Sequence, residues 1–377
     1  MKPNLVHPAA GCRRVVEKLA LAGAVAAVLS STARAQSPEM GVNFTNADRL
    51  SVAARDTALD QMKAAGVKAI RTPLAPQWGA GSFQPSVDVV KAAWARGIKS
   101  SLVISLTAST YFAAGTARRP ADPAMPSIYA AYRLSDVDPD LFAAAVAPLL
   151  QQLDDAGVQL AGIELFNEIG NPAFNGDIAI NGPRGGYLIG FDDLLDPAYA
   201  DVAHGYRNYI RVLAALKDLR DGLTVNKLTP IISAGLNTPG DVLEGTKLNV
   251  TEDQVSLRGV LTFLRANGLD DYVDHYGVHA YILWAGNSAS NIHYLNSALI
   301  MDSYTKPIAV TEWGMKVAVG CPTSDAARQT QFNLFRGEMA RYGEEVVSLF
   351  AFDWNGSSYG IYLCGALTGS GSIALGP

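Results

Sequence analysis

Eight short apolar runs recur along the chain with helical stretches between them, and this repeat constrains the fold more than any other feature of the sequence. Several runs are apolar at almost every position, which is typical of parallel strands buried on both faces. The predicted strands are residues 40–44, 67–74, 99–106, 161–167, 228–234, 272–281, 307–312 and 346–354. Because eight parallel strands alternating with helices close a (β/α)8 barrel (TIM barrel), we predict this α/β fold as a single domain.

The stretches between the predicted strands carry residues that typically begin and end helices. The predicted helices are 87–96, begun by Ser86; 139–157, begun by Asp138; and 325–342, begun by Ser324. The last segment, residues 355–377, is rich in Gly and Ser and predicts no eighth helix. An open, doubly wound sheet would alternate in the same way, but the glycine-rich phosphate-binding turn expected after its first strand is missing. The barrel is therefore favoured.

The longest loops follow predicted strands. The loop after the third strand contains Pro120, Pro123 and Pro126, and the loop after the fourth spans residues 169–197 and is rich in Gly and Asn. The connections that lead back into strands are short. Because barrels build their active sites from the loops that follow the strands, we expect the functional site at this end.

Residues 1–35 have the pattern of a cleaved export signal. Basic residues come first, an apolar stretch follows at 19–29, and small residues at 33–35 suit a signal peptidase, so the mature domain would span residues 36–377. An uncleaved anchor is disfavoured because the apolar stretch is shorter than the ~20 residues of a membrane span. We expect a protein exported to the periplasm or the extracellular space, with the general and the twin-arginine routes both open.

The charge of the chain limits its partners. The net charge is −5, and loss of residues 1–35, which hold five basic residues and one acidic residue, changes it to −9. An acidic chain without a basic block binds nucleic acid or an anionic membrane poorly. No run after residue 35 is long and apolar enough to span a membrane. We expect a monomer with a neutral ligand.

Two predicted strands end in glutamates that would face each other across the barrel mouth. Glu168 comes at the end of the fourth strand and Glu312 at the end of the seventh. Cleavage of a glycosidic bond needs such a pair, because one acid protonates the leaving oxygen while the other attacks the anomeric carbon or activates water. A single acidic residue at a strand end is more often a solvated loop residue than a catalytic one. Two glutamates at the ends of strands four and seven together favour a catalytic role.

Short motifs around these glutamates resemble clan A of the glycoside hydrolases. The matching residues are Asn167-Glu168 on strand four, Glu312 on strand seven, His279-Ala280-Tyr281 on strand six, Arg71 at the end of strand two and Trp354 at the end of strand eight. The run VTEWG at 310–314 is similar to the nucleophile segment of some family 5 cellulases. The resemblance covers nearly the whole mature chain in order and spacing.

The resemblance implies a retaining β-glycoside hydrolase that acts on a polysaccharide or oligosaccharide by double displacement, without a cofactor. Glu168 would be the acid/base and Glu312 the nucleophile. Asn167 would bind the sugar 2-hydroxyl, and His279 would line the pocket. Tyr281 would hold Glu312, and Arg71 beneath Glu312 would keep that carboxylate ionised. Trp354 would stack on the sugar ring and precede a cis peptide bond to Asn355. Family 5 enzymes place a histidine near the end of strand three, where this chain has LTA at 106–108, so other clan A families remain open.

Two further residues are weaker candidates for substrate contacts. Asn43, near the end of strand one, could bind a sugar hydroxyl, and Trp284, in a loop after strand six, could offer a stacking surface. The remaining histidines lack the spacing of a metal-binding motif, so we predict no metal site. The main alternative from another class is a non-catalytic barrel that binds polysaccharide. Such a protein could lose either glutamate, and this chain has both.

Two of the three cysteines predict a disulfide. Cys12 lies in the export signal, which leaves Cys321 after strand seven and Cys364 beyond strand eight, on the same end of the barrel. Disulfides persist in the oxidising compartments to which exported proteins go.

We predict that exported protein begins at Gln36 and carries a Cys321–Cys364 disulfide worth ~3–4 kcal/mol of folding free energy by the chain-entropy estimate. Intact-mass measurement after alkylation without reductant should give the mass of residues 36–377 with no alkylated cysteine. Two alkylated cysteines would refute the disulfide, and a retained N-terminus would refute the cleavage.

Overall fold

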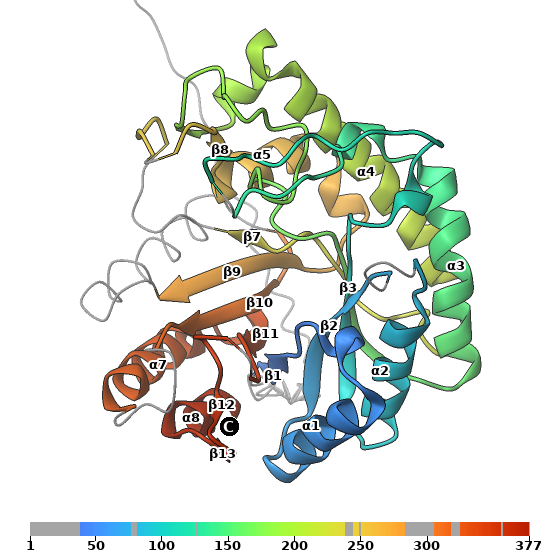
Figure 1. Cartoon of the computed structure of the whole chain (residues 1–377), viewed down its shortest axis with the longest axis vertical. Helices are drawn as coiled ribbons and strands as arrows, with labels where there is room; N and C mark the ends of the chain where they lie inside the picture. Colours follow the sequence, from blue (N-terminus) through green and yellow to red (C-terminus); the bar gives the residue numbers. More distant parts are fainter. Residues whose placement is uncertain are drawn as a thin grey trace, which may run out of the picture. The chain divides into compact units, whose positions relative to one another are not determined.

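Among the residues described by the computed structural model, nine strands form one parallel sheet (Figure 1), while β5 (Leu188–Ile189) pairs with β8 (Gln254–Val255) and β12 (Tyr362–Leu363) pairs with β13 (Ala366–Leu367) in two separate small sheets. The structure describes residues 38–76, 81–125, 127–237, 244–248, 250–282, 305–317, 325–355 and 357–376. The strands of the sheet are β1 (Glu39–Asn43), β2 (Ala69–Leu74), β3 (Lys99–Ile104), β4 (Leu160–Leu165), β6 (Ile231–Ile232), β7 (Leu236–Asn237), β9 (Tyr276–Ile282), β10 (Ile308–Met315) and β11 (Val346–Ala351). They are hydrogen-bonded in the order β6-β4-β3-β2-β1-β11-β10-β9-β7.

The two ends of this sheet are halves of one barrel strand. β6 pairs with β4, and β7 pairs with β9, both in parallel. A parallel bridge from Ile232 to His275 and another from Asn167 to Gly235 continue the ladder across the break. The sheet therefore closes into the eight-stranded (β/α)8 barrel that the sequence predicts, and the fold prediction is confirmed.

The fifth strand differs from the prediction of one strand over 228–234. Its backbone leaves the ladder before Gly235, whose N–H donates to the Glu164 carboxylate (3.0 Å) and whose carbonyl accepts from the N–H of Glu168 (2.9 Å). The N–H and carbonyl of Gly235, which would otherwise continue the strand pairing, are thus bonded to the side chain of Glu164 and the backbone of Glu168. The break belongs to the functional site described below.

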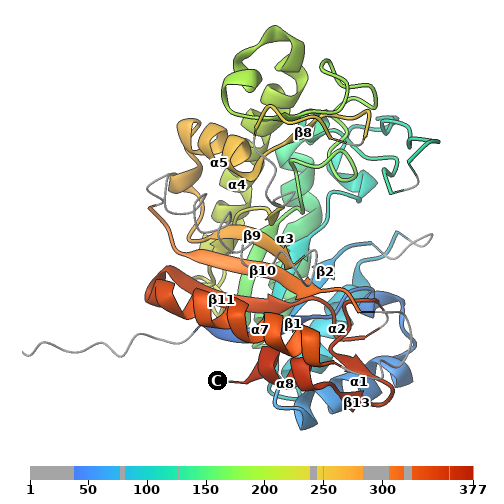
Figure 2. The same cartoon turned by 90° about the vertical axis from the view of Figure 1, so that its left-hand side faces the viewer.

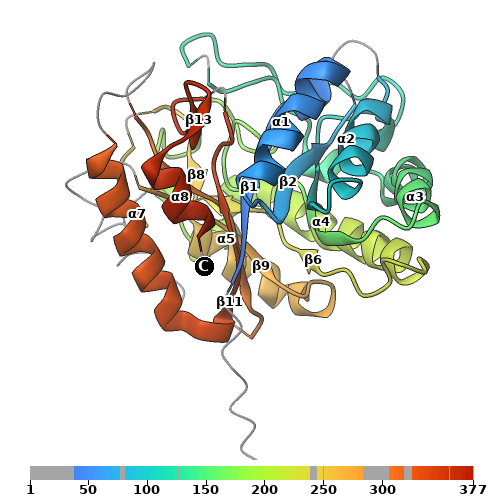
Figure 3. The same ribbon diagram turned by 90° about the horizontal axis from the view of Figure 1, so that it is seen from below.

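Seven helices of the described residues pack outside the strands. They are α1 (Val52–Ala64), α2 (Gln84–Trp94), α3 (Pro139–Asp155), α4 (Ala200–Asp221), α5 (Leu257–Ala266), α7 (Ala326–Met339) and α8 (Gly369–Leu375). Figure 3 shows α2 and α3 on one side of the strands and α7 and α8 on the other. No helix in these ranges is long and apolar enough to cross a membrane.

Helix starts agree with the sequence at α3 but not at α2. Asp138 caps α3 by accepting from the N–H groups of Asp140 (2.8 Å) and Leu141 (3.1 Å). α2 begins three residues earlier than predicted, because Pro85 in its first turn has no N–H to satisfy. Ser86 lies inside the helix, and its hydroxyl donates to the carbonyl of Ala75 (2.9 Å).

The C-terminal segment contains a helix that the sequence does not predict. α8 is begun by Thr368, whose hydroxyl accepts from the N–H of Gly371 (2.9 Å). Arg336 of α7 donates to the carbonyl of Ile373 (2.6 Å), and Asp325 accepts from the N–H of Ser370 (2.5 Å). Figure 2 shows α8 next to α7. These tertiary bonds stabilise a Gly- and Ser-rich segment of low helix propensity.

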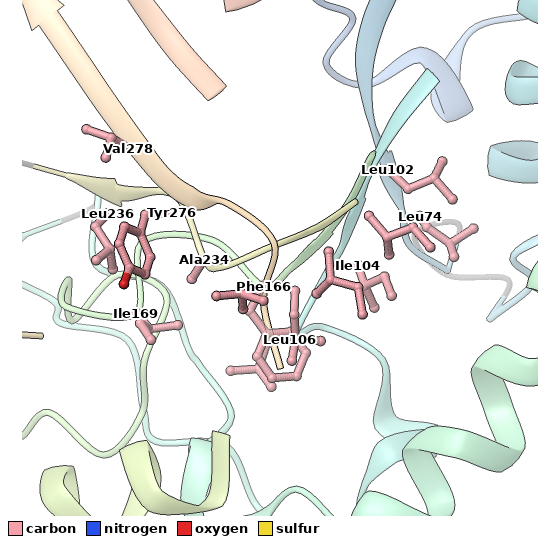
Figure 4. Packing of buried hydrophobic residues seen from close by; sticks show 14 of the residues in the cluster. Leu74, Leu102, Ile104, Leu106, Phe166, Ile169, Ala234, Leu236, Tyr276 and Val278 are labelled. Atoms are coloured by element: carbon pink, nitrogen blue, oxygen red, sulfur yellow. The ribbon is translucent and has the colours of Figure 1, made fainter. Parts of the chain in front are cut away.

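The apolar core fills the space between strands and helices, and Figure 4 shows part of it, with side chains from β3, β9 and the segment after β4. Phe166 is fully buried and contacts Phe142 of α3, with ring centroids 6.2 Å apart. Trp313 is also fully buried and stacks on Phe335 of α7, with ring centroids 4.7 Å apart. Trp313 therefore belongs to the core and not to a sugar-binding surface.

Cys364 lies in the turn between the short strands β12 (Tyr362–Leu363) and β13 (Ala366–Leu367). It is disulfide-bonded. Cys321 lies outside the described residues, so the pairing of these two cysteines stays a prediction.

Asp154, near the end of α3, holds the turn that leads to the fifth barrel strand. Its carboxylate accepts from the N–H groups of Thr224 (2.8 Å), Val225 (2.9 Å) and Asn226 (2.8 Å). Burial alone would raise the pKa of Asp154, but these hydrogen bonds lower it more, so its pKa lies below the ordinary 3.8. The ionised form is therefore the one that stabilises the fold.

Replacing Asp154 with Ala should lower the free energy of unfolding by about 2–3 kcal/mol at neutral pH, because three backbone amides, of which that of Asn226 is buried, lose a charged acceptor. Since the folded pKa is depressed, the difference from wild type should be present above about pH 3.8 and shrink as pH falls through the lower folded value. Urea denaturation at several pH values measures both. Asp155→Ala, the exposed neighbour, is the matched control and should have little effect.

Candidate active site

A cavity of about 640 Å³ opens at the C-terminal ends of the barrel strands. Residues of β1, β2 and β3, the segments after them and the segment after β4 form its wall, together with Glu312 of β10. Four residues that the sequence singles out line it, namely Asn43, Arg71, Asn167 and Glu312. The candidate site thus lies where barrel folds place their functional loops.

Glu168 lies just after β4, where the backbone leaves strand geometry. Phe166 (φ 63°) and Glu168 (φ 40°) both have left-handed backbone, which is uncommon for residues other than glycine and clusters at functional sites. The N–H of Asn171 donates to the carbonyl of Glu168 (2.8 Å), and its side-chain amide donates to the Glu168 carboxylate (3.1 Å). These bonds hold a nearly buried carboxyl group in one position.

A β-bulge in β10 brings Glu312 beside His279 of β9. Val310 is paired with Val278, but Glu312 is paired with His279, so β10 has one extra residue at this point. A bulge changes the direction of the side chains that follow it. Oε2 of Glu312 consequently lies 3.4 Å from Nδ1 of His279.

His279 joins the two glutamates. Its Nδ1 also lies 2.8 Å from Oε1 of Glu168, and ligand atoms of Glu168, His279 and Glu312 all lie within 4.8 Å of one another. The imidazole is fully buried. It therefore lies behind the carboxylates, and does not line the pocket as the sequence resemblance implied.

Arg71 of β2 is held by four side chains. Its Nε and Nη2 donate to the two carboxylate oxygens of Glu164, at 2.7 Å each. Nη1 donates to Oε1 of Glu312 (2.6 Å) and to Oδ1 of Asn43 (2.8 Å). Nη2 also donates to Oδ1 of Asn167 (2.9 Å). The guanidinium thus links β1, β2, β4 and β10 beneath the site.

Glu164 of β4 is a member of this network that the sequence motifs do not single out. It is fully buried, and its partners are Arg71 and the N–H of Gly235. Glu164 could have been identified in the sequence as an acidic residue within an otherwise apolar strand, because a buried carboxylate needs a cation or several hydrogen-bond donors. Its two oxygens match the planar fork of the guanidinium.

The charges around Glu312 favour its ionised form. Burial alone would raise the pKa of Glu312, but the positive charges of His279 and Arg71 and the hydroxyl of Tyr281, which donates to Oε2, lower it below the ordinary value. Burial alone would lower the pKa of His279, but Glu312 and Glu168 raise it above the ordinary value. The site therefore favours a Glu312 carboxylate beside a protonated His279.

Three aromatic side chains stand beside Glu312. The ring of Tyr281 lies 5.8 Å from that of Phe352 and 5.0 Å from that of Tyr359, between centroids. Burial and the negative charges of Glu312 and Glu168 raise the pKa of Tyr359. Phe352 and Tyr359 are partly exposed, and neither stands out in the sequence.

Trp354 does not have the position that the sequence resemblance implied. It is fully buried and stacks on Tyr362, with ring centroids 4.7 Å apart, so it cannot form the floor of the site. β11 ends at Ala351, and Phe352 is the aromatic residue that directly follows it. The non-proline cis peptide is Phe352–Asp353, so its prediction at Trp354–Asn355 is wrong by two residues.

The remaining predicted contacts divide into three cases. Asn43 is 1% exposed, and its amide is used by Arg71 and by the carbonyl of Thr311 (2.9 Å), so it supports the site from below. Asn167 is partly exposed and lines the cavity, as a residue that contacts a ligand would. Trp284 lies outside the described residues.

Glu168, His279 and Glu312 are also the one set of described residues whose ligand atoms are close enough to hold a metal ion. The surroundings of Glu312 do not suit a cation. Arg71 already supplies a positive charge 2.6 Å from Oε1, and the Tyr281 hydroxyl is bonded to Oε2. The arrangement suits proton transfer and nucleophilic attack better than metal binding.

No protein-family profile and no curated protein matches this sequence. Solved structures with similar folds do match. A fungal β-1,4-galactanase aligns with a TM-score of 0.55 at 16% identity, over 89% of this chain and 95% of its own. A β-glucosidase from Thermotoga maritima has a TM-score of 0.56 at 12% identity, over 89% and 96%. A mannanase from Bacillus subtilis has a TM-score of 0.51 at 14% identity, over 90% and 86%.

These structural similarities show the barrel fold over most of the chain. At such low identity they do not by themselves carry activity to this protein. The likeness to family 5 stays a prediction.

Gly235, in the break of the fifth strand, leaves room for His279. A Cβ at this position would overlap Nε2 of the imidazole and lie 2.8 Å from Oε1 of Glu164. The site therefore depends on the absence of a side chain here.

Replacing Gly235 with Ala should displace His279 from the glutamates and cost about 1–3 kcal/mol of folding free energy through overpacking. NMR titration of His279 should then show its raised pKa moving down toward the ordinary value of 6.5. Gly337→Ala is the matched control, since a Cβ there meets nothing within 4 Å. An unchanged His279 titration in a folded Gly235→Ala variant would contradict this account of the site.

Proposed function

We propose that this protein is a retaining β-glycoside hydrolase with Glu312 as nucleophile and Glu168 as acid/base. The observation that carries the proposal is the pair of nearly buried carboxyl groups with oxygens within 4.8 Å of each other, at the mouth of a barrel. Retaining enzymes hold their two carboxyl groups ~5–5.5 Å apart, whereas inverting enzymes hold them wider to admit a water molecule.

The first step would use the ionised state of Glu312. Its carboxylate attacks the anomeric carbon and forms a covalent bond to the sugar, while the bond from that carbon to the leaving oxygen breaks. Glu168 gives its proton to the leaving oxygen. Arg71 and Tyr281 orient the nucleophile through its two oxygens.

The second step would reverse the role of Glu168. Once Glu312 is esterified it carries no negative charge, and Glu168 takes a proton from a water molecule. The oxygen of this water bonds to the anomeric carbon while the bond from that carbon to Glu312 breaks, which releases the sugar and restores the Glu312 carboxylate. His279, 2.8 Å from Oε1 of Glu168, provides a second position for that proton.

The chemistry of the cavity supports a sugar ligand. Asn167 and Glu312 line it. Phe352 and Tyr359 are not part of this lining, but their rings lie next to that of Tyr281 and have partly exposed faces on which sugar C–H surfaces can stack. The similar structures are named for hydrolysis of β-1,4-galactan, β-glucosides and mannan. A monomeric enzyme that cleaves β-linked glycans after export, once residues 1–35 are removed, is the function we infer.

Glu312→Ala should remove nearly all hydrolysis of a responsive β-glycan, because it removes the carboxylate that forms the glycosyl intermediate. Glu168→Ala should keep slow activity on an aryl glycoside with a good leaving group, and azide should partly restore its turnover. Product NMR should show retained anomeric configuration. Glu344→Ala, an exposed acid at the other end of the barrel, is the control and should be fully active.

A polysaccharide panel with product analysis provides the substrate for these assays. The alternative, a non-catalytic polysaccharide-binding barrel, predicts binding to the panel without product, and equal binding by both glutamate variants. Inverted products would instead contradict the nucleophilic role of Glu312.

A further inference from the structure

The wall of the catalytic cavity carries a cation that the proposed reaction does not use. Arg118 is exposed, lines the cavity and forms no ion pair with any described residue. The arginines of the cavity wall are Arg49, Arg71 and Arg118, and the carboxylates are Asp48 and Glu312. Arg71 is used by Glu164 and Glu312, and Arg49 interacts with the carboxylate of Asp48, so Arg118 is the cation of this wall without a carboxylate partner among the described residues.

Arg118 is held in place by stacking. Its guanidinium lies 4.5 Å from the ring centroid of Tyr132, and Tyr132 stacks on Phe112 with ring centroids 4.1 Å apart. Nη2 also donates to the carbonyl of Thr107 (3.2 Å). A stacked guanidinium loses little further side-chain entropy when it binds a ligand.

The neighbouring Arg119 anchors the same segment in the protein. Arg119 is buried, and its guanidinium donates to the carbonyls of Pro120 (2.9 Å), Tyr129 (3.0 Å) and Pro172 (2.6 Å). Its backbone exchanges two hydrogen bonds with Ala131. The loop after β3 is thereby fixed to the loop after β4, while Arg118 faces the cavity.

We propose that Arg118 binds a carboxylate of the glycan, so that the preferred substrate contains uronic acid residues and differs from the neutral ligand that the net charge of the chain predicts. This proposal rests on the proposed glycosidase function and names its substrate class. The planar guanidinium fork matches a carboxylate, and the hydroxyls of Ser105, Thr107 and Ser109 on the same wall suit the neutral hydroxyls of the same sugars. The acid group would lie on a sugar beside the cleaved bond, because Arg118 and Glu312 line one cavity.

The test compares β-linked oligosaccharides that contain glucuronic acid with the same compounds after reduction of the carboxyl group. Wild-type enzyme should cleave the acidic member of a pair with kcat/KM about tenfold or more higher, as expected for a charge-assisted hydrogen bond. Arg118→Ala should reduce this ratio to about one and change cleavage of the reduced member less than about threefold. Arg118→Lys should keep only part of the ratio, because lysine cannot bind a carboxylate through a planar fork.

Arg207→Ala is the matched control, because Arg207 is also exposed and lies over an aromatic ring, that of Phe263 at 5.4 Å, on α4 outside the cavity lining. It should keep the wild-type ratio. A wild-type ratio near one, or an equal loss on both members in Arg118→Ala, would overturn the proposal. If no member of any pair is cleaved, the proposed glycosidase function is wrong. The carboxylate site at Arg118 is then tested by calorimetry, which measures the binding of the same oligosaccharide pairs. Tighter binding of the acidic member that Arg118→Ala abolishes would support the carboxylate site, and equal or absent binding would refute it.

Discussion

The buried guanidinium of Arg71 is the interaction on which the site depends. Burying one arginine and two glutamates costs several kcal/mol of desolvation per ion, which close ion pairs and hydrogen bonds must offset. Arg71 meets this condition through bonds to Glu164, Glu312, Asn43 and Asn167. Because these partners come from different barrel strands, the same contacts fix the register of the strands and the ionisation of the nucleophile.

The second constraint is the break in the fifth strand. At Gly235 the backbone donates to Glu164 and accepts from Glu168, and the missing side chain makes room for His279. Loss of regular strand pairing at this position is thus linked to the placement of both glutamates. Left-handed backbone at Phe166 and Glu168 is part of the same local departure from regular structure.

The loops after β3 and β4 shape the wall of the cavity. The loop after β3 supplies Arg118 and hydroxyl side chains to the cavity wall, and buried Arg119 ties it to the loop after β4. This is the part of the wall that we assign to substrate choice. Barrel folds change specificity in this way, by loop variation on a constant scaffold.

Local sequence patterns predict the barrel, the end at which its site lies, and the two glutamates with Arg71, Asn167, His279 and Tyr281 around them. Those features follow from local patterns, since buried strands are apolar runs and a polar residue at a strand end must face the mouth or solvent. Three features could not be predicted from local patterns and are seen in the folded protein: Glu164 binds Arg71, a bulge brings Glu312 beside His279, and Phe352 rather than Trp354 lies at the site. The helix formed by residues 369–375 is a further such feature. The reason is that the direction of a side chain at a strand end depends on register with neighbouring strands, and register is set by partners that lie far away in the sequence.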